Sequence, residues 1–423
     1  MDTYRRENYE MYKRGEDRIK NYTEEIKNRV LTRMDVSRDI SDEELWALID
    51  EAVAEQTEAR PSLRMREAAR EQIFHALRGL DVLQELIEDP QITEIMVNGY
   101  QHIFYEKEGQ LLQWDKRFSS GEKLEDVIQS IVAAGNRMVN EAAPIVDTRL
   151  RDGSRVNIVL SPIAIDGSVI TIRKFPERPM QMEDLLERGS LSQEIAEELG
   201  RLIQAGYNMF VSGGTGSGKT TFLNALSGYI PQSERVITIE DSAELQLNDI
   251  PNLVRLETRA ANLENVSEIP IRQLIRTALR MRPDRIIVGE CRGAEALDML
   301  QAMNTGHDGS LSTGHANSCR DMLRRLETMV LMGMELPVSA IRSQIASGID
   351  VLIHLGRLRD RTRKVLDIME IDGIEQGEIR LHPLYHFAET GEENGRITGK
   401  WQRQGTLLHR EKLAAAGLEE GCA

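Results

Sequence analysis

The feature that most constrains this chain is a glycine-rich segment between an apolar strand and a helix. Residues 208–212, NMFVS, are followed by GGTGSGKT (213–220) and then by a helical run, TFLNALSGYI. The segment matches the pattern GxxxxGK[ST] and lies where that pattern has to lie, between a strand and a helix N-terminus. Small residues let the backbone wrap closely around a polyphosphate, and the helix N-terminus adds partial positive charge. We therefore expect a phosphate-binding loop on an α/β sheet.

The residues of this loop have separate expected roles. The ammonium group of Lys219 would reach the β- and γ-phosphates of ATP, and the hydroxyl of Thr220 would bind Mg²⁺. The predicted nucleotide-binding residues are Gly213, Gly214, Thr215, Gly216, Ser217, Gly218, Lys219, Thr220 and Thr221.

The chain has two parts that differ in their predicted secondary structure. Around the loop, helices alternate with apolar strands, which predicts a mainly parallel, doubly wound sheet. The strands expected there are 208–212, 235–240, 285–290, 310–313 and 350–355. Upstream, short β-prone runs surround a helical segment at 122–135, which is typical of a compact α+β domain. The strands expected there are 92–98, 102–106, 111–118, 155–160 and 168–175.

The N-terminal part of the chain is helical by pattern. Residues 65–88 have helical apolar spacing, and residues 1–60 contain one glycine and no proline. For residues 1–35, a mobile, solvated arm is an equally good interpretation. The proline-containing segment PERPMQ (176–181) is the best domain boundary. We expect a helical extension at 1–80, an α+β domain at 81–175, a linker at 176–190 and the phosphate-loop domain at 191–423.

Composition limits the classes of protein to which the chain can belong. The net charge is −16 and aromatic residues make up 4% of the chain. Binding of nucleic acid needs net basic surface and stacking rings, so this composition does not favour it. Cys291, Cys319 and Cys422 form no CxxC pair, which favours a reducing compartment. The sequence has no apolar run of membrane-spanning length and no apolar signal segment at its start. We expect a cytoplasmic protein without direct nucleic-acid binding.

Acidic residues follow two of the predicted strands. VITIE ends in Glu240-Asp241, with Glu244 three residues later, and RIIVGE ends in Gly289-Glu290. Ligands of open α/β sheets bind outside the carboxyl ends of the strands. A lone acid there is often a helix cap, but three together favour Mg²⁺ binding and water activation. Glu290 is placed as a Walker B carboxylate that would hold the metal or its waters.

Histidines and arginines are also arranged. His315 follows the strand SLST (310–313) after Gly314 and is a candidate contact for a γ-phosphate, with His307 a weaker one. Arginines at 272, 276 and 280 recur at helical spacing, which is typical of a solvated face, although such a stripe could reach a neighbouring subunit. Two more candidates of this kind are Arg255 and Arg259.

The order of these motifs resembles the secretion or traffic ATPases of type II and type IV systems. The similarity is greatest to the CpaF type, which assembles Tad (Flp) pili. It rests on residues 274–318, LIRTALRMRPDRIIVGECRGAEALDMLQAMNTGHDGSLSTGHANS, and upstream on ITEIMVNG (92–99), DTRLRDGSRVN (147–157) and VITIRKFPERP (169–179). The resemblance implies a RecA-like P-loop ATPase domain preceded by a smaller α+β N-terminal domain and a helical N-terminal extension.

The resemblance also implies roles for the matched residues. Glu244 would polarise the attacking water, and Glu240 and Asp241 would complete an acidic box that handles Mg²⁺, directly or through water. Glu290 is the Walker B acid, and His307 and His315 fall in the histidine box. Arg155 and Arg173 match arginines that the N-terminal domain brings to the nucleotide.

The expected partners come from the same resemblance. Proteins of this family form homo-hexameric rings, bind nucleotide between their two domains and act on inner-membrane platform proteins. The chain would then be cytoplasmic and held peripherally at the inner face of the cytoplasmic membrane through its partners.

Other functions remain open at this point. The chain has no tetracysteine zinc module, which argues against the type II secretion and type IVa extension branch. An ATPase of a conjugative or effector type IV secretion system is the nearest alternative. A RecA-like DNA translocase or a catalytically silent nucleotide-binding scaffold is more distant, since the charge opposes the first and the intact acids oppose the second.

Overall fold

The chain forms two compact units, residues 1–177 and 178–423, each with its own hydrophobic cores. The computed structural model describes residues 22–34, 40–55, 62–107, 109–135, 137–175, 178–259 and 267–419. Within these ranges, no helix is both long and apolar enough to cross a bilayer. The finer four-part division stays a prediction, except that the expected linker contains α6 (Met182–Glu187), whose buried Met182 and Leu185 join the core of the second unit.

The first unit opens with helices that share a small core. Residues 22–33 are helical, followed by α2 (Asp42–Ala54) and α3 (Leu63–Arg78). Ser41 caps α2, because its hydroxyl accepts from the N–H of Glu44 while that glutamate accepts from the N–H of Ser41. Buried side chains from all three helices include Ile26, Val30, Leu45, Ile49 and Ile73. Residues 22–33 are therefore packed helix, and residues 1–21 lie outside the described ranges.

The helix expected at 65–88 is interrupted. The helix α3 ends at Arg78, and after Gly79 the chain forms a short 3₁₀ turn, η1 (Asp81–Leu83), and then α4 (Gln84–Glu88). Asp81 has a φ of 55°, which breaks the helical path. The apolar spacing continues through the break, so the pattern alone does not reveal it.

The rest of the first unit is an antiparallel sheet. Its strands are β1 (Ile92–Asn98), β2 (His102–Lys107), β3 (Gln110–Gln113), β4 (Ile145–Arg149), β5 (Arg155–Val159) and β6 (Val169–Arg173), in the order β3-β2-β1-β6-β5-β4. The helix α5 (Gly121–Ala134) packs its apolar face into the core of this sheet. β3 stops at Gln113 rather than at 118, and β4 was not predicted.

The second unit is built on one long sheet. Its strands are β7 (Met209–Gly213), β8 (Arg235–Glu240), β9 (Asn252–Glu257), β10 (Arg285–Val288), β11 (Leu311–His315), β12 (Val351–Arg357), β13 (Arg363–Glu375), β14 (Glu378–Glu393) and β15 (Arg396–Arg403). The order is β9-β8-β10-β11-β7-β12-β13-β14-β15. Pairing is parallel from β9 to β12 and antiparallel from there to β15. The antiparallel extension was not predicted.

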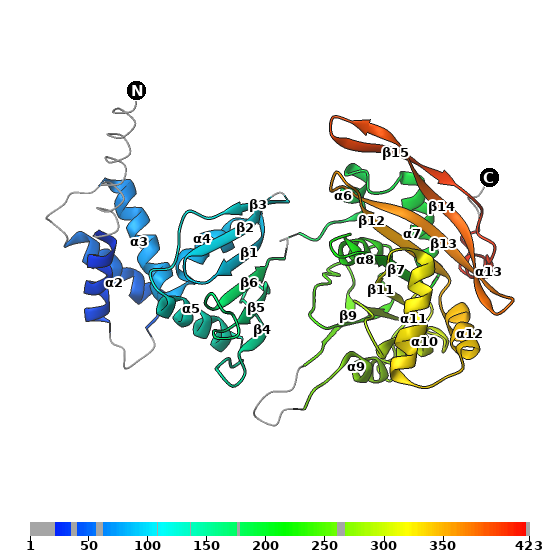
Figure 1. Ribbon diagram of the computed structural model, residues 1–423, viewed down its shortest axis with the longest axis horizontal. Helices are drawn as coiled ribbons and strands as arrows, with labels where there is room; N and C mark the ends of the chain where they lie inside the picture. The colour runs from blue at the N-terminus through cyan, green and yellow to red at the C-terminus, as the bar shows by residue number, and fades with distance from the viewer. Residues whose placement is uncertain are drawn as a thin grey trace. The chain divides into compact units, whose positions relative to one another are not determined.

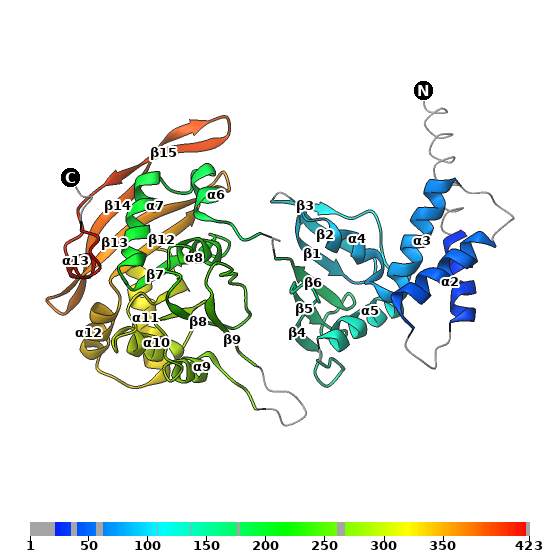
Figure 2. The same ribbon diagram turned by 180° about the vertical axis from the view of Figure 1, so that it is seen from behind.

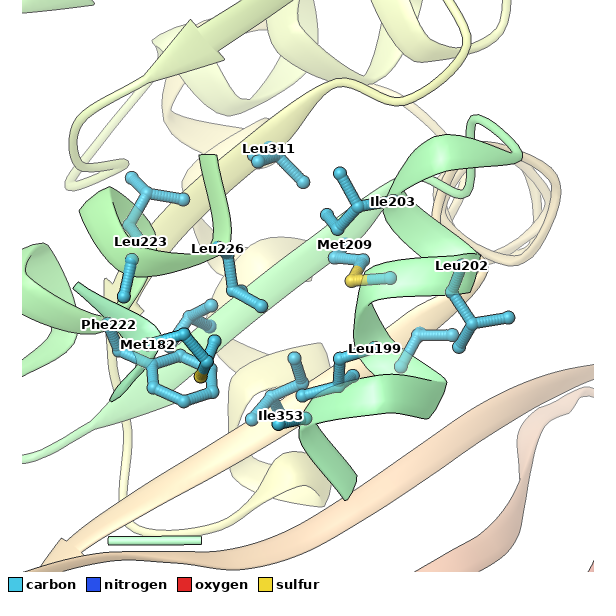
Figure 3. Close-up of a cluster of buried hydrophobic side chains, with 14 of the residues drawn as sticks. Met182, Leu199, Leu202, Ile203, Met209, Phe222, Leu223, Leu226, Leu311 and Ile353 are labelled. Atoms are coloured by element: carbon cyan, nitrogen blue, oxygen red, sulfur yellow. The ribbon is translucent and has the colours of Figure 1, made fainter. Parts of the chain in front are cut away.

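Helices cover both faces of the parallel part (Figures 1 and 2). On one face lie α6, α7 (Gln193–Gln204) and α8 (Lys219–Ser227), and on the other α9 (Ile271–Ala278), α10 (Glu295–Met303), α11 (Cys319–Gly333) and α12 (Val338–Gly348). Alternate residues of β7 serve the two cores: Met209 packs with α7 and α8, and Phe210 with the opposite helices. Figure 3 shows the first of these cores. The doubly wound arrangement is thus confirmed.

Candidate functional site

The glycine-rich loop lies at the carboxyl end of β7, a central strand of the sheet. It leaves the strand at Gly213 and enters α8 at Lys219. Gly216 and Gly218 have φ angles of 71° and 90°, which side-chain-bearing residues rarely adopt. A Cβ on Gly213 would lie 2.6 Å from the carbonyl oxygen of Leu355 on β12. The sequence therefore uses glycine where the backbone turns tightly and packs against a neighbouring strand.

Three hydrogen-bond donors of the loop converge on one oxygen. The carbonyl oxygen of Gly214 accepts from the N–H of Ser217 at 3.3 Å, from the hydroxyl of Ser217 at 2.9 Å and from Nζ of Lys219 at 3.0 Å. Lys219 is buried, and this burial lowers the pKa of its ammonium group. A cradle of N–H, O–H and ammonium donors is the arrangement that a phosphate oxygen requires, so the loop fits an anionic ligand.

A second cluster lies beside the loop, at the carboxyl ends of β10 and β11. Nζ of Lys219 is 3.3 Å from Nδ1 of His315, whose Nε2 lies 2.9 Å from Oε1 of Glu290. Oε1 of Glu290 accepts no hydrogen bond from the described residues, so its contact with His315 is a close approach and not a hydrogen bond. Arg292 donates to the other oxygen, Oε2, at 2.8 Å. Burial lowers the pKa of His315, which therefore stays a neutral imidazole near pH 7.

The acidic segment after β8 is organised by Glu240. Its Oε2 accepts from the N–H groups of Glu244 at 2.7 Å and Leu245 at 2.9 Å. Burial raises the pKa of Glu240 to about 7. Its Oε1 is buried without a hydrogen bond to any described residue. Glu240 thus holds the backbone that carries Glu244, while Oε1 remains as the atom for the metal contact that the sequence predicts.

The other predicted residues of this unit follow β8 or open α8. Asp241 is exposed, with Oδ2 3.7 Å from Nη1 of Arg292, and the side chain of Glu244 is half-buried. Thr220 and Thr221 occupy the first turn of α8 and are half-buried. The phosphate loop and the acids of β8 and β10 therefore belong to one edge of the sheet, as the strand order requires.

The described residues contain no group of three or more His, Cys, Asp or Glu side chains arranged to hold a metal ion. Mg²⁺ usually keeps several waters and takes one or two carboxylates together with phosphate oxygens. The hydroxyl of Thr220 and the carboxylates of Glu290 and Glu240 would hold such an ion together with phosphate oxygens.

Arg155 and Arg173 lie in the first unit, directly across from each other on β5 and β6. The register continues through Arg149 on β4, opposite Arg155, and Glu94 on β1, opposite Arg173. Arg155 lies 3.8 Å from Asp147, and Arg173 lies 3.9 Å from Glu94. The row thus holds three arginines and one glutamate, and Asp147 and Glu94 partly balance the positive charge. Arg149 was missed, although DTRLRDG contains it.

The structure does not bring His307 to the cluster. His307 precedes β11, and its carbonyl accepts from Ser310 at the amino end of that strand, whereas His315 ends it. The two histidines therefore lie beside opposite ends of the parallel strands, His307 at the amino ends and His315 at the carboxyl ends. The eight positions that follow His307, up to His315 itself, comprise three residues before β11 and the five residues of the strand.

The arginine stripe on α9 is neither a simple solvated face nor a free cationic surface. Nε of Arg272 and Nε of Arg276 donate to the two oxygens of Asp298 at 2.6 and 2.7 Å. Asp298, on α10, is 2% exposed. Arg280 donates to the carbonyl of Arg276. Two of the three arginines therefore join α9 to α10.

Two further arginines escaped the sequence analysis. Arg285, in the segment RPDRI, is fully buried and pairs with Glu234 and with the carbonyl of Ile203. Arg363 opens β13 and donates to the carbonyl of Gly216 at 2.8 Å. The density of arginines in GRLRDRTRK (356–364) was the available signal for the second.

Comparisons with known proteins identify the family that this chain matches. Residues 76–402 match the family described as type II/IV secretion system protein. A Mycobacterium tuberculosis (strain CDC 1551) protein named for conjugal transfer is 34% identical over 316 residues, or 73% of this chain and 89% of the relative. The type IV secretion system protein PtlH of Bordetella pertussis is 34% identical over 326 residues, or 70% of this chain and 95% of PtlH.

A solved structure shares the fold. The ATPase DotB of Yersinia pseudotuberculosis superposes with a TM-score of 0.51, at 20% identity, over 70% of this chain and 79% of DotB. The expected fold class is confirmed: a RecA-like α/β domain follows a smaller α+β domain and a helical extension.

Proposed function

Because the chain belongs to the type II/IV secretion system protein family, we propose that it is a Mg²⁺-dependent ATPase. We propose further that it works as a homo-hexameric ring motor that powers assembly of a Tad (Flp) type pilus or a type II-like secretion step. The observation that carries the proposal is the cradle of donors on Gly214, with Lys219 in contact with the His315–Glu290–Arg292 cluster.

The loop would bind and charge-balance the phosphates. The donors now gathered on the Gly214 carbonyl, from Ser217 and Lys219, would turn to phosphate oxygens. The partial charge of the α8 N-terminus acts in the same direction. Catalysis of phosphoryl transfer rests mainly on positioning and on charge stabilisation, which these groups supply.

The acids would order water and metal. The backbone around Glu244 is fixed by two hydrogen bonds to Glu240, so the Glu244 carboxylate has a defined position from which to orient water. Glu290 is held by Arg292 and lies beside a neutral His315, which can sense an anion next to Lys219. Bound Mg²⁺ would neutralise phosphate charge, held by Thr220 and, directly or through water, by Glu290, Glu240 and Asp241.

The first unit would contribute positive charge. Arg155 and Arg173 lie side by side on one sheet face, and we propose that they bring this charge to the nucleotide. In the proposed ring, closing and reopening of the first unit around hydrolysis is the power stroke. The motor would be cytoplasmic and would contact inner-membrane platform proteins, without direct binding of nucleic acid.

The second candidate function is the ATPase of a conjugative or effector type IV secretion system. The names of the two relatives, conjugal transfer protein and PtlH, favour it. The genes beside this one distinguish the two: pilin and platform genes of a Tad cluster support pilus assembly, whereas a set of type IV channel genes supports secretion.

ATP turnover of the full chain tests the activity. We expect Glu244→Gln to abolish phosphate release while Mg·ATP still binds and native mass spectrometry still detects a hexamer. Glu335→Gln, the same substitution at an exposed site on the α11–α12 connection, should turn over ATP like the wild type. Equal turnover in all three proteins would remove Glu244 from its role, and a hexamer that binds ATP without turnover in any would indicate a scaffold.

A further inference from the structure

The turn between β12 and β13 lies against the phosphate loop. Nε of Arg363 donates to the carbonyl oxygen of Gly216 at 2.8 Å, and a Cβ on Gly218 would lie 3.3 Å from Cδ of the same arginine. Nη1 of Arg357 is 3.9 Å from the position that a Cβ on Gly216 would take. Two guanidinium groups of the second unit thus flank the outer side of the loop.

The turn that leads into Arg363 is fixed in place. The N–H of Leu358 donates to the carbonyl of Thr362, closing the turn. The carboxylate of Asp360 accepts from the N–H of Thr362 at 3.0 Å and from its hydroxyl at 2.7 Å, and also from the N–H of Ile397 at 2.7 Å. Since Ile397 belongs to β15, the turn is anchored to the far strand of the antiparallel extension.

The bond to Gly216 controls the direction of a neighbouring N–H. A trans peptide is planar, so the C=O of Gly216 and the N–H of Ser217 point in opposite directions. Arg363 holds this C=O on the outside of the loop. The N–H of Ser217 is then turned inward, where it joins the hydroxyl of Ser217 and Nζ of Lys219 on the Gly214 carbonyl.

We propose that Arg363 is a positioning residue of the nucleotide site, which pre-orients the phosphate loop from the antiparallel extension of the sheet. The inference rests on the proposed function, since it assigns a device to the same loop. Arg363 acts through the peptide between Gly216 and Ser217 rather than by touching phosphate. Its loss leaves Lys219 and the acids in place but releases one N–H from the cradle, so nucleotide affinity falls more than turnover at saturation.

The test measures binding of a fluorescent ATP analogue, mant-ATP with Mg²⁺, and the KM and kcat of the full chain. We expect Arg363→Ala to raise Kd and KM about tenfold, the effect of one hydrogen bond from a charged donor, with kcat reduced less than threefold. Arg363→Lys, which keeps a donor, should recover part of the affinity. Arg359→Ala is the matched control, because Arg359 lies on the same turn but pairs with Glu389 and Glu392.

The possible outcomes distinguish a failure of the inference about Arg363 from a failure of the proposed function. Wild-type affinity in Arg363→Ala, or an equal loss in Arg359→Ala, overturns the role of Arg363 and leaves the ATPase intact. A kcat that falls by the same factor as the affinity also overturns the role of Arg363, because such a loss indicates general damage to the site. If Arg363→Ala does not fold, Arg363→Met keeps the aliphatic stem and is judged by the same values. A wild-type chain that binds no nucleotide refutes the proposed function itself.

Discussion

The clamp between α9 and α10 predicts a large loss of stability for Asp298→Asn. The carboxylate is 2% exposed and accepts charged hydrogen bonds from Arg272 and Arg276, whose side chains are 31% and 56% exposed. Breaking a fully buried pair costs about 3–5 kcal/mol. Because water can reach both arginines, the lower end applies, and we expect a loss of about 3 kcal/mol. For a unit of this size, that lowers Tm by about 6–12 °C.

Differential scanning calorimetry of the full chain measures this loss. Asp249→Asn is the matched control, because Asp249 is an exposed aspartate of the same unit and should leave Tm unchanged. Arg276→Met should cost less than Asp298→Asn, since it removes the more exposed partner. An Asp298→Asn chain within about 0.5 kcal/mol of wild type, the usual range for surface changes, would refute the clamp. The stripe would then be available for a neighbouring subunit, the alternative that the spacing left open.

Three further predictions concern the site. Lys219→Met should lower ATP turnover by about a hundredfold or more, measured by phosphate release, because it removes the ammonium group from the cradle. Glu240→Gln should flatten the pH dependence of denaturant unfolding. In the folded chain, Glu240 keeps its proton up to about pH 7, whereas an ordinary glutamate loses it near pH 4.5. The free energy of unfolding of the wild type therefore falls as the pH rises between these two values. A wild-type curve without that fall would contradict the burial argument. Gly213→Ala should cost about 1–3 kcal/mol in the same assay, because its Cβ would meet Ser217 and Leu355.

Local pattern was enough for the strands whose side chains alternate or are apolar throughout. Residues 92–98 and 235–240 were predicted as strands and form β1 and β8 with the same bounds. β1 alternates in burial from Ile95 to Asn98, after a register shift between Ile92 and Glu94, and β8 is buried along almost its whole length, so each has a local signal. The phosphate loop was predictable for the same reason, since the glycine pattern, the strand and the helix are contiguous.

The antiparallel extension was not predictable because its periodicity is broken. Between β13 and β14 the register shifts at Ile368/Met369 and again at Ile371/Ile374, and between β14 and β15 it shifts at Glu389/Gly391. Each shift moves the following side chains to the other face, so no alternation survives over the strand. β13 pairs with β12, β14 with β13 and β15 with β14, so these strands are specified by successive hairpin pairing rather than by the apolar pattern of each strand.

The places of the remaining site residues depend on partners that are distant in the sequence. Arg285 looks like a surface residue in RPDRI, but its burial depends on Glu234, which lies 51 positions earlier. Arg363 reaches Gly216 across 147 positions. The roles of Glu244, Glu290, His315 and the two N-terminal arginines stay predictions until variants are measured.

The long sheet of the second unit also has a consequence for crowding. In the described chain, its two outer strands are β9 and β15. An open strand edge is a template on which another chain can add a strand. Here the edges carry Arg255 and Glu257 on one side and Arg396, Lys400 and Arg403 on the other. Such charges disfavour strand addition, so copies of this chain at high local concentration are protected from joining sheet to sheet.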